Sequence, residues 1–243
     1  MGIFKHIWDI SGRDQYRTVD DLIERATPNA NYYALLVLSS LVITAGVLMN
    51  NIAVLIGGML ITPLLTPILV IALGITAGQP KVSGTAFRLV IQSLLFVVAG
   101  AFALGMIFGQ PEGEPLLDNS MRSTLLYLII AAASGIAATY AWIKKEAFEA
   151  LPGVAIAVSL VPPAAYIGVG LGTLDFEMAR MFFIVLAVNV FGIIGGSMVV
   201  FSQFGFYKTR ALVEKKAEEQ AEIIKEQKAE EEIQEQTDAL TKI

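Results

Sequence analysis

Two clusters of proline, glycine and hydroxyl residues are the features of this sequence most capable of chemistry. The first lies in the apolar stretch 53–74 and the second in the apolar stretch 151–172. Proline removes a backbone N–H and clashes with the carbonyl four residues earlier, so it breaks a helix. Inside a membrane, the backbone groups freed by a break must be satisfied by protein or by water in a cavity. Both clusters therefore indicate a candidate site for a polar solute at mid-membrane depth.

The candidate pathway combines backbone groups freed by the prolines with hydroxyl and amide side chains. Two asparagines stand before the first cluster, and a third lies in a later apolar stretch. Alternatively, the hydroxyls bond back to their own helices, and the third asparagine joins two helices. The predicted pathway residues are Asn50, Asn51, Gly57, Gly58, Thr62, Pro63, Thr66, Pro67, Ser159, Pro162, Pro163 and Asn189.

Several chemistries are excluded by composition. There is no cysteine, and the one histidine, His6, lies near the N-terminus, so thiol catalysis and a histidine triad in the body are excluded. The formal net charge of −5 does not indicate nucleic-acid binding. An enzyme acting on lipid or on a buried peptide bond would depend on charged residues at the ends of apolar stretches, namely Glu146, Glu149, Arg88 and Arg122. We expect no catalytic residue, no metal, no cofactor and no enzymatic activity.

The elements that position these residues are predicted from where charge is absent. Hydrophobic residues make up 55% of the chain and charged residues 16%, against about 25% charged in ordinary soluble domains. A chain of this size could not bury so much apolar surface as a soluble monomer. Because a membrane helix needs about 20 apolar residues, the charge-free stretches predict six spans, near 33–49, 53–78, 86–109, 123–143, 150–173 and 180–205.

Lys and Arg residues predict the orientation of the spans. Twelve lie before span one, after spans two and four, and soon after span six, whereas only Arg122 and Arg180 lie on the other side. This bias places both termini in the cytoplasm and the chain in the inner membrane of a cell. The twelve residues are Lys5, Arg13, Arg17, Arg25, Lys81, Arg88, Lys144, Lys145, Lys208, Arg210, Lys215 and Lys216.

The second and fifth spans resemble each other when Pro63 is aligned with Pro162, and each lies between two plain apolar spans. The transmembrane domain, 32–207, therefore reads as two units of three spans, 32–110 and 120–207. Because three is odd, the second unit enters the membrane from the opposite side. We expect an all-α integral membrane protein built from two inverted three-helix repeats, with the second and fifth helices broken by proline.

Four glycine pairs at GxxxG spacing are predicted to allow close helix packing. They are Gly74/Gly78, Gly105/Gly109, Gly168/Gly172 and Gly192/Gly196.

The two ends of the chain are polar. Residues 1–31 form an amphipathic cytoplasmic or interfacial segment, whose apolar face begins with Ile3, Phe4, Ile7 and Trp8. A short helix is predicted over 20–26, capped by Thr18 and stopped by Pro28. Residues 208–243 contain ten acids and seven bases and predict a cytoplasmic helix. This tail is either a solvated helix, partly disordered, or an oligomerising coiled coil.

Two motifs in this chain resemble those of the domain-of-unknown-function 389 family, which are hydrophobic membrane proteins of bacteria and archaea. The first is NNIAVLIGGMLITPLLTPIL, residues 50–69, and the second is LPGVAIAVSLVPPAAYIGVGLG, residues 151–172. The resemblance covers roughly residues 30–205. This chain departs from the family's pattern at Asn51, where a small residue, often serine, is typical. The resemblance implies the architecture and adds little about substrate.

The function that the pattern favours is a small-solute or ion transporter or channel with a midplane site at the paired breaks. No carboxylate lies within the spans, which disfavours a proton or metal exchanger, and helix N-termini favour anions. A neutral or anionic substrate therefore fits best, and a homo-oligomer is plausible for six spans. The alternative is a membrane scaffold or regulatory subunit that recruits a cytoplasmic protein through residues 208–243.

Overall fold

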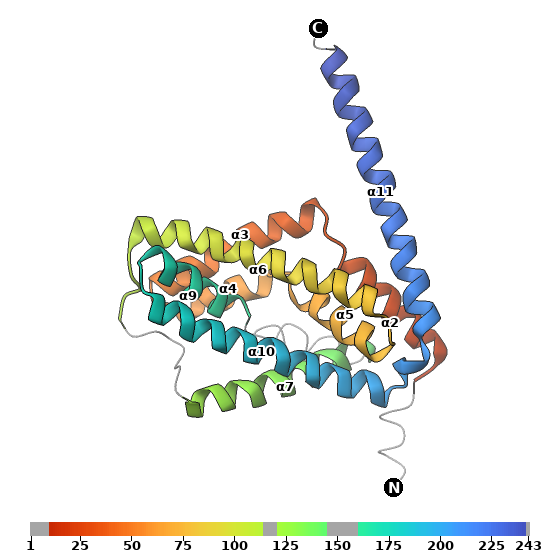
Figure 1. The fold of residues 1–243 in the computed structure, drawn as a ribbon, viewed down its shortest axis with the longest axis horizontal. Coiled ribbons are helices and arrows are strands. Elements are labelled where there is room, and N and C mark those ends of the chain that lie inside the picture. Colours follow the sequence, from red (N-terminus) through yellow and green to blue (C-terminus); the bar gives the residue numbers. More distant parts are fainter. Residues whose placement is uncertain (1–9, 114–120, 145–159, 242–243) are drawn as a thin grey trace.

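The computed structural model describes residues 10–113, 121–144 and 160–241, and within these ranges all regular structure is helical (Figure 1). Most helices lie side by side in one elongated bundle, and the last helix leaves it at one end. The helices are α2 (Gly12–Arg25), α3 (Ala30–Leu48), α4 (Ile52–Ile61), α5 (Leu65–Thr76), α6 (Pro80–Phe108), α7 (Met121–Ile143), α9 (Val161–Gly172), α10 (Phe176–Gln203), the 3₁₀ turn η2 (Phe206–Lys208) and α11 (Arg210–Thr241).

Four of these helices, α3, α6, α7 and α10, are long and apolar enough to cross a membrane. The second predicted span is broken as expected: α4 and α5 are bent by 56° around residues 62–64 and together make a fifth candidate. Large apolar side chains such as Ile107 and Phe191 are about 70% exposed (71% and 74%) on the outside of the bundle. Such a surface suits lipid rather than water. The first half of the predicted fifth span lies outside the described residues.

Helices α3 and α6 run side by side in the same direction. Near the start of α3 and at the middle of α6, the Tyr32 and Ser93 hydroxyls share a buried hydrogen bond of 2.8 Å. At their far ends, the Glu112 N–H donates to the Leu48 carbonyl at 3.0 Å. Because these contacts advance along both helices together, α3 and α6 are parallel.

Helices α7 and α10 form a second parallel pair. Gly192 packs against Leu128, Gly196 packs against Ala132, and the Ser197 hydroxyl donates to the Gly135 carbonyl at 3.2 Å. The contacts again advance together along the two helices. Small residues at these positions allow the backbones to approach closely.

The predicted packing role of the glycine pairs is confirmed for most members. Gly168 and Gly172 of α9 lie against α6, where Phe102 is their shared neighbour, and Gly105 of α6 lies against Val169 of α9. Gly78 and Gly109 instead follow helix ends, with φ of 68° and 85°, and make no close contact through a Cβ position. At these two positions glycine allows the backbone conformation of the turn, because it adopts positive φ without strain.

Three tight turns between helices share one hydrogen-bond pattern, in which a carbonyl in the last helical turn accepts an N–H from five residues further on. In each case the residue whose carbonyl accepts is a glycine that lies against the following helix. The residue just before the donor adopts positive φ. The accepting carbonyls belong to Gly46, Gly74 and Gly170, the donors are Asn51, Gln79 and Asp175, and the residues at positive φ are Asn50, Gly78 and Leu174.

These turns reveal an equivalence of 96 residues between two parts of the chain. Helix α9 begins and ends 96 residues after α5, and α10 begins 96 residues after α6. Gly170 and Leu174 then match Gly74 and Gly78 in the turns. The sequence alignment of Pro63 with Pro162 is therefore three residues out of register, because Pro163 is the residue equivalent to Pro67.

The start of α2 corrects a second expectation. The helix begins at Gly12 and not at residue 20, because Ser11 and Asp14 form a capping box there. Thr18 is buried in the middle of the helix and caps nothing. The predicted apolar face at residues 3–8 lies outside the described residues.

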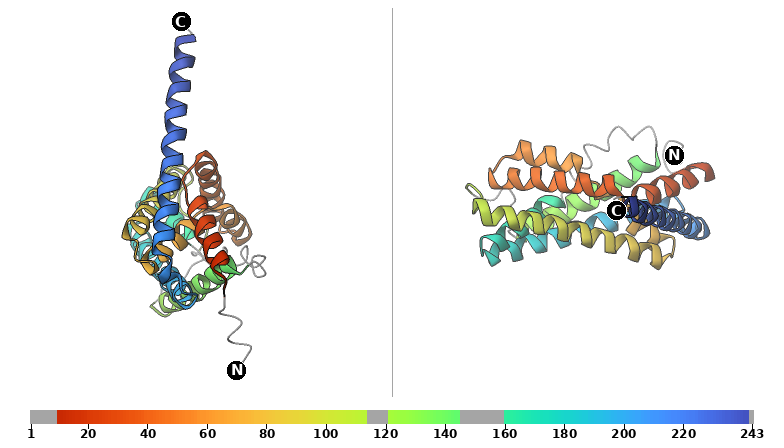
Figure 2. Two further views of the ribbon diagram at one scale, coloured as in Figure 1. Left: turned by 90° about the vertical axis from the view of Figure 1, so that its right-hand side faces the viewer. Right: turned by 90° about the horizontal axis from the view of Figure 1, so that it is seen from above.

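One end of the bundle, here called the α2 end, gathers segments from across the chain. The Gln15 side chain donates to the Phe204 carbonyl after α10, and the Arg17 guanidinium donates to the Ile143 carbonyl at the end of α7, both at 3.0 Å. The first turns of α11 also pack here, with Val213 fully buried. Beyond them, α11 projects away from the bundle (Figure 1; Figure 2, left view).

Replacing Leu174 with glycine is expected to stabilise the protein by about 1 kcal/mol, because a non-glycine residue in the left-handed region is strained by roughly 1–2 kcal/mol. Leu174 has φ of 62° and its side chain is 75% exposed, so little packing is lost. Thermal unfolding in detergent measures the change. Gly78→Leu makes the reverse change at the equivalent turn and should lower the unfolding temperature. An unfolding temperature of Leu174→Gly that is unchanged or lower than that of the wild-type protein would contradict the prediction.

Candidate functional site

Two helices begin inside the bundle rather than at its ends. Helix α5 starts after Leu64 and α9 starts after Leu160, and each of these leucines is only 2% exposed. The residues at the N-cap positions, Leu64 and Leu160, provide no side-chain cap. The first backbone N–H groups of a helix have no partner within it and carry the positive end of its dipole. Two sets of such groups therefore lie in the interior.

The prolines occupy the first turns of these helices. Pro67 is the third residue of α5, and Pro162 and Pro163 are the second and third residues of α9; all three are buried. These positions lack an intrahelical acceptor, so proline removes a donor that would otherwise have no partner. Pro67 therefore lies just after the linker 62–64, which contains Pro63, and Pro162 and Pro163 lie just after residues 145–159, which are outside the described ranges.

The hydroxyls near the first break differ in their partners. The Thr62 hydroxyl donates to the Gly58 carbonyl at 3.1 Å, which is the bond back to its own helix that the sequence left open. Thr66, the second residue of α5, is half-buried, and no hydrogen bond to its hydroxyl occurs within the described ranges. Ser159 lies outside them. Among the described residues, Thr66 therefore has a hydroxyl group available at the start of α5.

Asn50 and Asn51 are not brought to the break. Asn51 caps the start of α4, where its side-chain oxygen accepts from Ala53 and Val54 at 3.0 and 3.2 Å. Asn50 takes positive φ in the turn before α4, so α4 separates both from the break by about 15 Å. Asn189 is buried in the middle of α10, at 6% exposure, and lies 96 residues after Ser93 of α6.

The two glycines of α4 have different surroundings. Gly58 packs against Ile43 of α3, while a Cβ atom on Gly57 would meet nothing within 4 Å. The structure therefore brings together Thr62, Pro63, Thr66 and Pro67 around the first break, with Gly58 one turn before it. It places Pro162 and Pro163 at the start of α9.

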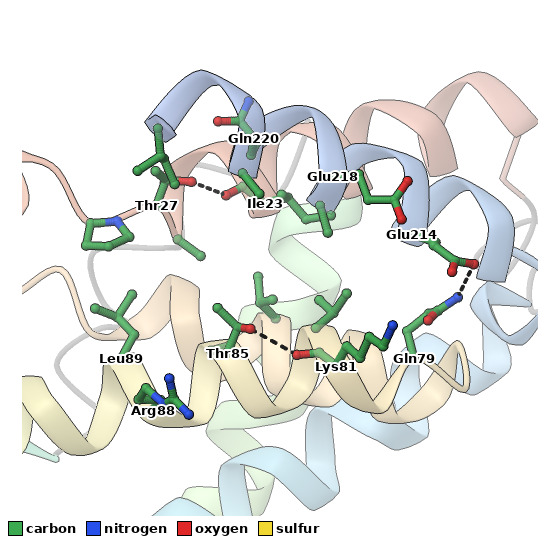
Figure 3. Close-up of a pocket in the computed structure, with 18 of the residues that line it drawn as sticks. Ile23, Thr27, Gln79, Lys81, Thr85, Arg88, Leu89, Glu214, Glu218 and Gln220 are labelled. Atoms are coloured by element: carbon green, nitrogen blue, oxygen red, sulfur yellow. Dashed lines mark hydrogen bonds between the residues drawn. The ribbon is translucent and has the colours of Figure 1, made fainter. Parts of the chain in front are cut away.

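A pocket of about 370 Å³ at the α2 end was not predicted from the sequence. It lies between α6 and α11, with the end of α2 closing one side (Figure 3). Its lining includes Lys81, Thr85, Arg88 and Gln92, which recur at i, i+4, i+7 and i+11 along α6. That spacing puts polar side chains on one face of a helix. This polar face is the feature of the sequence from which a pocket beside α6 could have been predicted.

An ionic cluster joins α11 to α2 near this pocket. The Lys216 ammonium lies 2.9 Å from Asp20 of α2 and 2.8 Å from Glu219 of α11, and 4.9 Å from the centre of the Tyr16 ring. The hydrogen bond to Glu219 is the main cause that raises the pKa of Lys216. The bond from Lys216 lowers the pKa of Glu219 below its ordinary 4.5.

We expect docking of α11 on α2 to weaken in acid. Glu219 lies on α11 itself and holds the Lys216 ammonium in the position from which it pairs with Asp20 of α2. A carboxyl group with a lowered pKa contributes this stabilisation above its ordinary pKa, and the contribution is lost as pH falls through the lowered value. Because the chain has no cysteine, spin labels on Glu24→Cys and Glu222→Cys report the distance between the two helices. The distance distribution should broaden below pH 4.5; in the Glu219→Gln variant it should be broader at neutral pH and change less. Identical titrations of both proteins would contradict this assignment.

Comparison with known proteins gives a family but no described activity. The model of the family described as "Domain of unknown function (DUF389)" matches residues 59–195. An uncharacterized protein of Methanocaldococcus jannaschii is 29% identical over 171 residues, which cover 70% of this chain and 53% of that protein. The chain thus spans about half the length of that relative. No solved structure matches.

Proposed function

The chain belongs to the DUF389 family, and we propose that it is a transporter or channel for a small solute or ion. The observation that carries this proposal is the pair of helix starts at Leu65 and Val161, each preceded by a buried leucine that provides no side-chain cap. Helices that begin at mid-membrane depth in corresponding parts of two halves are typical of transporter binding sites. The proposed site is the region between these two starts.

We further propose six spans arranged as two inverted three-helix repeats. In support, α5–α6 and α9–α10 share helix starts and turn geometry at a spacing of 96 residues. Helix α9 runs parallel to α6, since Gly168 and Gly172 meet successive turns of α6. Helix α10 turns back from α9, so it runs opposite to its counterpart α6. The parallel pairs α3–α6 and α7–α10 fit the first and third helix of each repeat.

The proposed orientation places the α2 end in the cytoplasm, with the chain in the inner membrane of a cell. The ends of α5, α7 and α10 and the starts of α6 and α11 all gather there with α2. Their flanking cations include Arg17, Lys81, Lys144 and Lys208. Excess Lys and Arg mark the cytoplasmic side, which supports cytoplasmic N- and C-termini.

The proposed substrate is anionic or neutral. No Asp, Glu, Lys or Arg occurs from Tyr32 to Gln79, and none occurs from 150 to Leu174. Among the described residues, the groups at the two helix starts include backbone N–H groups and the Thr66 hydroxyl, which are donors at the positive ends of helix dipoles. Such a site would attract a small anion more strongly than a cation.

A flux assay in proteoliposomes tests this proposal. Purified protein is reconstituted with chloride, nitrate, sulfate or phosphate inside, and efflux is followed with ion-selective electrodes and valinomycin present to carry potassium. Neutral solutes are tested in the same vesicles by light scattering. Flux of at least one of these solutes above protein-free vesicles supports the proposal, and no flux of any of them would count against it.

The alternative function is a scaffold that recruits a cytoplasmic protein through α11. It is favoured by one observation: beyond its contacts with α2 and α6, α11 projects from the bundle with charged and largely exposed residues (Figure 2, left view). Truncation after Ile224 keeps the docked part of α11 and removes the rest. Flux that survives this truncation places transport in the membrane body, whereas loss of a cellular phenotype with intact flux favours the scaffold.

We also propose that the chain catalyses no reaction, because its predicted spans contain no carboxylate, histidine or thiol. The candidate residues for an enzyme are at span ends, and Glu149 lies outside the described ranges. Turnover of a lipid that disappears in Glu149→Gln would overturn this.

A further inference from the structure

The pocket between α6 and α11 has walls of opposite charge. On α6, Lys81 and Arg88 lie on the face that lines the pocket, about 10 Å apart along the helix. On α11, Glu214 and Glu218 are four residues apart and therefore neighbours on the opposite wall. Figure 3 shows the carboxylates coming from α11 and the cations from α6, with the pocket between the two helices.

These charges do not neutralise one another. Within the described ranges, none of the ion pairs includes Lys81, Arg88 or Glu218. Glu214 accepts a hydrogen bond of 2.9 Å from the Gln79 side chain and keeps a second oxygen. A ligand that fits between the walls would satisfy both if it carried an anionic group toward α6 and a cationic donor toward α11.

The pocket also has an apolar floor that continues onto the outer surface of the bundle. Ala86, Leu89 and Val70 line it and are at most 5% exposed. Beyond Arg88 and Gln92, the same side of α6 presents Ile91 and Leu95, which are 40% and 62% exposed. Apolar side chains exposed on a membrane helix face lipid tails. A ligand here would therefore be an amphiphile whose tail lies along α6.

We propose that this pocket binds one zwitterionic phospholipid with a primary amine, of the phosphatidylethanolamine type. Its phosphate contacts Lys81 and Arg88, its ammonium donates to Glu214 and Glu218, and one acyl chain follows Leu89 and Leu95. A singly anionic lipid such as phosphatidylglycerol would leave the carboxylates without a partner. Phosphatidylcholine has no N–H to donate. The lipid would bridge α11 to the membrane body, and this assignment is independent of any transport activity.

Native mass spectrometry of the full chain in a mild detergent tests the proposal. Dioleoyl phosphatidylethanolamine, phosphatidylglycerol and phosphatidylcholine are titrated separately and in competition, and inorganic phosphate is added as a soluble competitor. The variants are Lys81→Gln/Arg88→Gln and Glu214→Gln/Glu218→Gln. The matched control is Arg13→Gln/Glu222→Gln, which changes exposed charges outside the pocket.

The wild-type protein and the control should retain one phosphatidylethanolamine at least tenfold more tightly than the other two lipids. Both pocket variants should lose at least tenfold in that affinity, and the carboxylate variant should shift preference toward phosphatidylglycerol. Equal binding of phosphatidylglycerol by the wild type with no effect of Glu214→Gln/Glu218→Gln would overturn the zwitterionic assignment. Displacement by millimolar phosphate would assign a free anion instead, and pocket variants that bind like the control would overturn the site.

Discussion

Gly196→Ala is expected to destabilise the protein by about 3 kcal/mol, the upper part of the range for overpacking. A Cβ atom at Gly196 would collide with the carbonyl oxygen of Ala132 in α7 and lie 3.0 Å from its carbonyl carbon. These are backbone atoms, so no side chain can rotate away, and α7 and α10 would have to separate. Loss of that parallel pair should lower the thermal unfolding temperature in detergent by several degrees.

The neighbouring residue provides a matched control. Gly195 is exposed on α10, and a Cβ atom there would meet nothing within 4 Å. Gly195→Ala should therefore leave the unfolding temperature unchanged or raise it slightly, because alanine is favoured over glycine in a helix by about 1 kcal/mol. If the two variants unfold at the same temperature, the close packing of α7 on α10 is wrong.

The sequence predicted the apolar helices and the first break because both depend on local residue type. A charge-free stretch long enough to span a bilayer can be recognised without knowing which helices pack against it. The first break is likewise marked by a local residue, because Pro63 lies within the linker between α4 and α5. The register of the second half could not be predicted in the same way. Leu174 occupies the turn position that Gly78 fills in the first half, and leucine gives no sequence signal for positive φ.

The remaining errors come from interactions that span the chain. Whether a proline breaks a helix or begins one depends on which carbonyls lie nearby, so Pro67 and Pro163 read as breaks in the sequence. The true cap of α2 is visible in the sequence as Ser11 followed three residues later by Asp14, but Thr18 is also a residue type that caps helices. The polar face of α6 was also visible, but its partner Glu214 lies more than 120 residues away on α11.

Thr66→Asp is expected to reduce anion flux at least tenfold. Thr66 is the second residue of α5, where a carboxylate would sit at the positive end of the helix dipole, so the variant should fold. A fixed negative charge within about 8 Å of a bound anion would oppose it by about 2 kcal/mol or more at an effective dielectric constant of about 20. That repulsion corresponds to roughly a thirtyfold loss of occupancy.

Thr66→Asn separates charge from shape, because asparagine has nearly the same size as aspartate and remains neutral. We expect Thr66→Asn to keep anion flux within about threefold of the wild-type protein in the same vesicles. The flux of a neutral solute should be nearly the same in the two variants, because an uncharged molecule is not repelled by the carboxylate. Equal anion flux in the aspartate and asparagine variants would move the site away from the start of α5. Equal losses for anions and neutral solutes would instead indicate a steric block, because only charge discriminates between the two side chains.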